Sequence, residues 1–145
     1  MHSPASMTNL QINQCRLFLQ PSQLALSTKL LNDLFYQQVL RVLDALAAEV
    51  ASTYAVQVES RWLGYQQKIE QLKRFNPDMA EVKRFDGLLS ESAWFEQVLQ
   101  GLQINAQDNV SNKQIITVQQ DNKQQVILQQ LQQFVLQIRQ LLQYE

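Results

Sequence analysis

The sequence has little glycine and proline, three residues of each in 145, and one cysteine, Cys15. Folds with many strands depend on turns rich in glycine and proline, so this scarcity argues against a sandwich or a barrel. One cysteine cannot form an intramolecular disulfide, and with the single histidine, His2, it cannot build a Cys/His metal site. We therefore expect a helical protein from a reducing compartment, with no metal ion and no other cofactor.

Long apolar runs and a large net charge are also missing. No apolar stretch approaches the roughly 18 residues of a membrane span, and the N-terminal residues lack the basic and apolar regions of a secretory signal. The formal net charge is −1 at pH 7, which gives no global field to attract nucleic acid or an anionic membrane. We predict a cytoplasmic protein with no membrane segment, for which nucleic acid is not the expected partner.

What the sequence does contain is typical of an ordinary globular chain. Hydrophobic residues make up 46% and charged residues 17%, and there are 26 glutamines, 14 of them after residue 100. Glutamine favours helices. The length suits one domain, which we assign to residues 8–145. Residues 1–7 have the composition of a disordered leader or tag, so that Met7 is a candidate native start.

A long helix over residues 24–54 is predicted by two interleaved rows of apolar side chains. A helix that is apolar on more than one face is central in a bundle or lies in an oligomer interface. The first row is Leu31, Phe35, Val42 and Leu46, and the second is Leu40, Leu43, Ala47, Val50 and Tyr54.

A second long helix closes the sequence. We expect Asp121 and Gln124 to cap its start. Its core positions, spaced by four and three, are Ile127, Leu131, Phe134, Ile138 and Leu141. The opposite face is almost entirely glutamine, which is polar but uncharged, so two copies would not repel each other. This face and the surplus apolar surface of residues 24–54 predict a homodimer.

Shorter helices are predicted elsewhere from apolar spacing, proline positions and a capping pattern. Asp78 and Glu81 have capping-box spacing. Between residues 103 and 120 the helical pattern lapses, and we expect a loop with a short strand. The shorter helices run over residues 8–19, from 59 or 60 to 75, from about 79 to 89, and 93–102. The fold class is therefore all-α, a helical bundle of about five helices with a long central helix and a long C-terminal helix.

Catalytic chemistry has no visible basis in this sequence. The only histidine is His2, no Ser/His/Asp or Cys/His set exists, and the carboxylates do not form Glu-x-x-His pairs. The three glycines stand alone, which excludes a phosphate-binding loop. Cys15 next to Arg16 has two interpretations, a reactive thiol or a small core residue, and we favour the second. We predict no catalytic residues and no enzyme activity.

Two near-repeats, Lys73-Arg74-Phe75-Asn76 and Lys83-Arg84-Phe85-Asp86, combine cations with aromatic rings. Such a combination suits a weak single-stranded nucleic-acid binder. The alternative is that the cations lie in the last turns of helices while the phenylalanines enter the core, and we favour this alternative. The residues of the nucleic-acid hypothesis are Arg61, Lys68, Lys73, Arg74, Lys83 and Arg84.

Aromatic residues supply the candidate protein-binding surface. Trp94 and Phe95 are adjacent, and neighbouring helix positions point about 100 degrees apart, so they cannot both face one core. An exposed aromatic side chain is a typical anchor for a protein partner. We assign Trp62, Tyr65, Trp94 and Phe95 to this surface.

Two segments, Thr8–Gln14 with Arg16–Leu19 and Ser92–Leu99, resemble parts of a family of small helical proteins of unknown function from Pseudomonas-like bacteria. The resemblance implies a bacterial, helical and non-catalytic protein. Together with the residue analysis it predicts a helical-bundle adaptor or regulatory protein that binds another protein of unknown identity. The alternative is the nucleic-acid binder.

Overall fold

The computed structural model describes residues 3–19, 28–57, 64–107 and 113–143, with side chains except at 28–31, 89, 103–107, 113–122 and 143. It confirms the predicted all-α bundle, and this part of the chain has six helices, one for each of the six segments predicted above to be helical. The helices are α1 (Pro4–Leu19), α2 (Thr28–Thr53), α3 (Tyr65–Phe75), α4 (Ala80–Glu91), α5 (Ala93–Gln107) and α6 (Lys113–Gln143).

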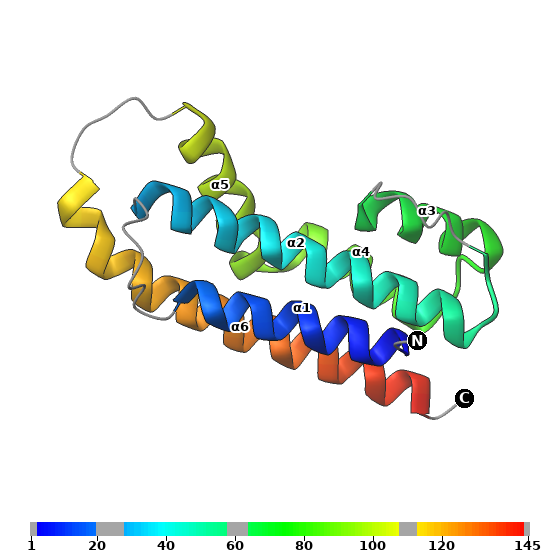
Figure 1. The fold of residues 1–145 in the computed structure, drawn as a ribbon. Helices are drawn as coiled ribbons and strands as arrows, with labels where there is room; N and C mark the ends of the chain where they lie inside the picture. Colours follow the sequence, from blue (N-terminus) through cyan, green and yellow to red (C-terminus); the bar gives the residue numbers. More distant parts are fainter. Residues whose placement is uncertain (1–2, 20–27, 58–63, 108–112, 144–145) are drawn as a thin grey trace.

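The three longest helices, α1, α2 and α6, lie side by side, and α1 runs antiparallel to the other two (Figure 1). The shorter helices complete the bundle, since α3 and α5 pack against α2, and α4 contacts α3, α5 and α6. Phe85 of α4 meets Phe134 of α6 edge to face, with ring centroids 5.2 Å apart. All six helices contribute to one continuous apolar core.

Helix α2 is the centre of the bundle and contacts α1, α3, α5 and α6. The described members of its apolar rows are buried within one chain or packed against the core, and Phe35, Val42, Leu46 and Val50 have no exposed surface. The predicted central position is therefore confirmed. The same burial removes the surplus apolar surface on which we based part of the homodimer prediction.

Helix α1 begins earlier than the predicted start, at Pro4. Ser3 precedes it as the N-cap, and its Oγ accepts a hydrogen bond from the Ser6 backbone N–H at 3.1 Å. Proline is favoured at the first helical position because its fixed φ suits the helix and its missing N–H is not needed there. Residues 4–7, which we assigned to a disordered leader, thus belong to the first helix.

The loop predicted over residues 103–120 is wrong wherever the structure describes it. Helix α5 continues to Gln107, and α6 begins at Lys113. Asp121 and Gln124 are consequently interior to α6 rather than a cap. The side chain of Gln124 is buried, and its Nε2 donates a hydrogen bond to Asn32 Oδ1 of α2 at 2.7 Å.

The capping box predicted from Asp78 and Glu81 is also wrong. The N-cap of α4 is Met79, which makes no side-chain capping bond. Glu81 points into the core instead, where its carboxylate accepts hydrogen bonds from the Tyr54 hydroxyl at 2.9 and 3.0 Å. A buried carboxylate needs such donors, and this need outweighs the local preference for capping.

A left-handed residue ends α2 directly after Tyr54. Ala55 has φ 55 just after the end of α2, and the Val56 N–H reaches back to the Ala51 carbonyl at 2.8 Å. This is a Schellman ending, in which the residue after the turn also packs on the core, as Val56 does. This turn therefore ends α2.

Over the part of the chain that the structure describes, no helix combines the length and the apolar character needed to span a membrane.

Candidate functional site

The predicted aromatic surface is mostly core. Tyr65 and Phe95 are buried and meet edge to face, with ring centroids 5.8 Å apart. Desolvation by burial raises the pKa of Tyr65, and a hydrogen bond from Gln66 partly opposes this rise. Trp94 is half-buried against Phe95 and the core, and Trp62 lies outside the described residues. Among the described members of this surface, Trp94 therefore keeps part of the predicted role.

The predicted basic set is divided by ion pairs. Lys68 is buried, with Nζ 2.7 Å from Asp44 Oδ1, and Lys73 Nζ lies 3.0 Å from Asp86 Oδ2. Arg61 lies outside the described residues. The members of the set that stay exposed are Arg74, Lys83 and Arg84.

The two phenylalanines of the near-repeats have different environments. Phe85 has no exposed surface, as expected for a core residue, whereas Phe75, at the last position of α3, is 58% exposed. The structure therefore keeps one aromatic ring and three cations of this segment at the surface.

Cys15 lies in the core of the α1 side of the bundle, with no exposed surface. Burial raises the pKa of its thiol from 9.0 to about 12, although the positive charge of Arg16 opposes the rise. The nucleophilic form is the thiolate, which a pKa this high nearly eliminates at neutral pH. The interpretation of Cys15 as a core residue, rather than a reactive thiol, agrees with this environment.

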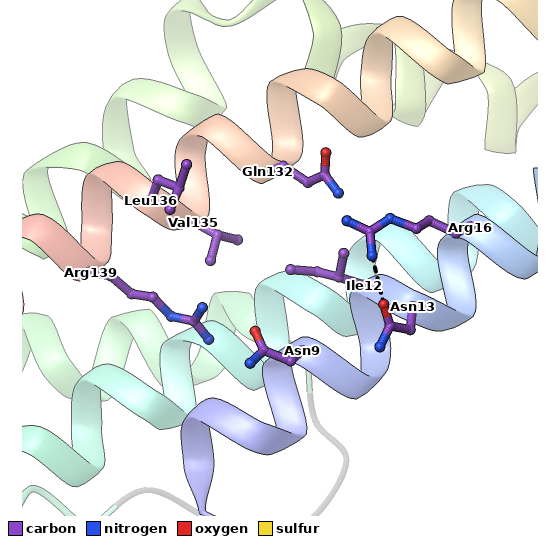
Figure 2. A pocket seen from close by; sticks show the side chains of 8 residues that line it. All are labelled: Asn9, Ile12, Asn13, Arg16, Gln132, Val135, Leu136 and Arg139. Atoms are coloured by element: carbon purple, nitrogen blue, oxygen red, sulfur yellow. Dashed lines mark hydrogen bonds between the residues drawn. The ribbon is translucent and has the colours of Figure 1, made fainter.

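A groove of about 470 Å³ lies between α1 and α6. Ile12 of α1 and Val135 of α6, both buried residues, form its apolar floor. Figure 2 shows the Arg16 side chain extending toward α6 and the Arg139 side chain extending toward α1. The remaining lining residues are Asn9 and Asn13 of α1 and Gln132 and Leu136 of α6.

At one end of the groove, Arg139 takes part in a network that joins three helices. Its Nε donates to Glu49 Oε1 of α2 at 2.9 Å, and its Nη2 donates to the Ala5 carbonyl of α1 at 3.2 Å. Thr8 Oγ1 donates to the second oxygen of Glu49 at 2.8 Å. Because the Glu49 side chain is only 9% exposed, this carboxylate depends on these donors. The positive charge of Arg139 is thus compensated by Glu49, and this arginine stabilises the packing of the three helices.

At the other end of the groove, Arg16 is exposed and its guanidinium faces no carboxylate among the described side chains. Its one hydrogen bond runs from Nη1 to Asn13 Oδ1 at 2.7 Å (Figure 2). A guanidinium has five N–H donors, so most of them remain available at the mouth of the groove. Arg16 is therefore the group here best placed to bind something outside the chain.

A second hollow, of about 410 Å³, lies on the other side of α1. Its lining contains Arg41, Asp44 and Lys68, and the last two form the buried ion pair described above. Opposite charges already meet within this hollow. The α1–α6 groove differs from it because no carboxylate belongs to its lining.

No group of three or more His, Cys, Asp or Glu side chains that could hold a metal ion occurs in the described parts of the chain. The groove itself is lined by amides, arginines and aliphatic side chains. These groups bind and orient, but they supply no nucleophile or general base with a pKa near neutrality.

The sequence analysis missed the groove. Asn9 and Arg139 come together only because α1 packs antiparallel beside α6, and apolar periodicity does not say which helices are neighbours. One signal was present, because Arg16 and Arg139 are rare charges on helices that are otherwise nearly free of them. Of these two arginines, Arg139 forms an ion pair with Glu49, whereas Arg16 stays exposed and forms a hydrogen bond with Asn13.

Comparison with protein-family models, with curated proteins and with solved structures finds no match for this chain. The resemblance to small helical bacterial proteins therefore stays a prediction.

Proposed function

We propose that this chain is a non-catalytic adaptor or regulatory protein that binds another protein through the α1–α6 groove. The observation that carries the proposal is the combination of the available Arg16 guanidinium with an apolar floor and with Leu136, which is 57% exposed at the rim. Arginine and apolar side chains that can be desolvated together are typical of the energetic centres of protein interfaces. The buried thiol of Cys15 and the lack of titrating groups in the groove support a non-enzymatic role.

The proposal also includes the setting of the protein. A single cysteine that remains a free thiol suits the reducing cytoplasm, and the resemblance described above favours a bacterial source.

The nucleic-acid alternative has less support. Lys68 and Lys73 are held in ion pairs, and binding of a phosphate backbone depends on several cations acting together. The exposed cations Arg74, Lys83 and Arg84 are too few to favour it over the groove.

Self-association has one remaining basis. The outer face of α6 carries exposed glutamines at positions 125, 129, 130, 133, 137 and 140, together with exposed Lys123, Val126 and Leu136. Sedimentation equilibrium is the direct measurement, because a mass that stays at 16.8 kDa up to high concentration would eliminate a homodimer through this face.

Affinity capture with matched charge reversals tests the proposed function. Arg16→Glu alters the groove, and Arg84→Glu alters another exposed arginine, on α4 and outside the groove. We expect a partner protein that is retained by the wild type and by Arg84→Glu but lost with Arg16→Glu. A partner retained by all variants would place the binding surface elsewhere, and a nucleic acid lost with Arg84→Glu would favour the alternative.

A further inference from the structure

The charges on α1 and α6 have one sign wherever their side chains are described. Within residues 4–19 and 123–142, the ionised side chains are Arg16, Lys123 and Arg139, all basic. The acidic side chains that the structure describes lie on α2, α3, α4 and α5 and in the turn between α3 and α4, whereas Asp121 of α6 lies outside the described side chains. Among the described side chains of α1 and α6, a partner approaching this groove therefore meets positive charge and no acidic group.

Arg16 is the uncompensated charge in the groove. The Arg139 guanidinium already binds Glu49, whereas Arg16 is bonded only to the neutral amide of Asn13. A carboxylate can accept two parallel N–H donors from a guanidinium, and such charge-assisted pairs are stronger than neutral ones. Charge complementarity thus assigns a carboxylate to the position in front of Arg16.

The floor beside Arg16 requires an apolar group on the same partner. Ile12 and Val135 line the groove between the two helices, and Leu136 forms the rim. A ligand that carried only charge would leave this apolar surface in contact with water. The occupant therefore presents an apolar side chain and a carboxylate close together.

The dimensions of the groove favour a helix as the occupant. From Asn9 to Arg16 the α1 wall extends about 10 Å, or two helical turns. The backbone groups of α1 and α6 are used within the helices, so they cannot pair with an extended strand. The three amides of Asn9, Asn13 and Gln132 are too few to satisfy such a strand, whereas a helix satisfies its own backbone.

We propose that the α1–α6 groove binds a two-turn amphipathic α-helical segment of a partner protein, with an apolar side chain over Ile12 and Val135 and a carboxylate against Arg16. This inference rests on the proposed function and specifies the partner that the groove accepts. A single uncompensated guanidinium beside an apolar floor suits an acidic helix better than a phosphate backbone, which needs a series of cations.

The test is a selection from a display library of random peptides of about 16 residues, enough for four helical turns, on the full chain. We expect the selected peptides to carry Asp or Glu three or four positions from Leu, Ile, Met or Phe. Their affinities are then measured by fluorescence anisotropy on three proteins: wild type, Arg16→Glu and Arg84→Glu. Loss of a charge-assisted hydrogen bond and the new repulsion should weaken binding to Arg16→Glu by at least about tenfold, with Arg84→Glu unchanged.

A second selection, on Arg16→Glu, gives the sharper result. Peptides from this second selection should carry Lys or Arg in place of Asp or Glu, at the same sequence spacing from the apolar residue. Arg16 is exposed and makes one hydrogen bond, so the variant should retain the wild-type circular dichroism spectrum and can be compared directly.

Several outcomes would overturn the inference: no selected peptide, peptides without acidic enrichment, equal affinity for Arg16→Glu, or tighter binding of a labelled single-stranded oligonucleotide in an Arg16-dependent manner. If cellular capture still depends on Arg16 while the selected peptides are not acidic, the proposed function stands and only the acidic helix is wrong. If cellular capture is independent of Arg16, the groove itself is excluded as the protein-binding surface.

Discussion

At the scale of single residues, two helical glycines differ in what surrounds them. A Cβ atom at Gly101 of α5 would lie 2.5 Å from Cε2 of the buried Tyr36 ring of α2, whereas one at Gly87 of α4 would meet nothing within 4 Å. Gly101 therefore allows α5 to approach α2 closely, and Gly87 has no such role.

We predict opposite effects for these two glycines in urea unfolding. Gly101→Ala forces the Tyr36 ring to move in a packed core and should lower the free energy of unfolding by about 1–3 kcal/mol. Gly87→Ala should raise it by up to about 1 kcal/mol, because alanine restricts the unfolded chain and favours the helix. Equal changes in the two variants would contradict the close contact between α5 and α2.

Cys15 provides a prediction about pH. Its pKa is raised from 9.0 to about 12 by burial, so the folded state retains a proton that the unfolded state loses above pH 9. Stability from this group is complete below pH 9 and is lost as the pH rises toward 12. We expect the free energy of unfolding to fall more steeply between pH 9 and 11 in the wild type than in Cys15→Ala. Parallel profiles would show that the thiol is not desolvated.

At the scale of helices, α2 and α6 were predictable because long, regular apolar spacing reports burial directly. The segment 103–120 was not, because asparagine and β-branched residues lower helix propensity only slightly, and neighbouring helical structure overrides such weak preferences. The Asp78–Glu81 pattern failed for a related reason, since a distant donor, Tyr54, binds the Glu81 carboxylate. Local sequence patterns predicted the positions of the helices. Contacts between residues far apart in the sequence determine where the helices begin and end and where the candidate site forms.

Helix α6 allows a direct test of its buried face. Ile138 has no exposed surface, whereas its neighbour Gln137 is exposed. Ile138→Asp places a carboxylate in the core with no donor and should lower the free energy of unfolding by several kcal/mol, roughly enough to unfold a marginal domain. Gln137→Asp should change it by less than about 0.5 kcal/mol. Thermal unfolding followed by circular dichroism separates the two, and similar losses would mean that the core face is misassigned.

At the scale of the whole molecule, the ion pair between Glu49 and Arg139 links α2 to α6, and the hydrogen bond from Arg139 to the Ala5 carbonyl links both to α1. Arg139→Met leaves the Glu49 carboxylate with one strong donor, Thr8, and should lower the free energy of unfolding by about 2–4 kcal/mol. Arg16→Met removes an exposed arginine without a carboxylate partner and is the matched control, with an expected change below about 0.5 kcal/mol. Both are measured by urea unfolding.

The double variant Glu49→Met/Arg139→Met distinguishes charge from packing. Removing both charges leaves no buried carboxylate unpaired, so the double variant should be more stable than Arg139→Met alone. If the stability losses of the single variants Glu49→Met and Arg139→Met simply add in the double variant, the Glu49 carboxylate does not depend on Arg139. The association of the three helices must then have another basis.

The same pair has a consequence for synthesis of the chain. Glu49 and Arg139 are separated by 90 positions in the sequence. At a synthesis rate of 5–20 residues per second, Arg139 is therefore added roughly 5–18 s after Glu49. Helices α1 and α2 can associate during this interval, but Ala5 and Glu49 still lack the guanidinium that joins them to α6. Ribosome-arrested chains that end before Arg139 should therefore be cleaved faster within α1 by a protease than chains in which α6 has fully emerged. Helix α1 is thus synthesised before α6, but it gains the hydrogen bond from Arg139 only after α6 has emerged.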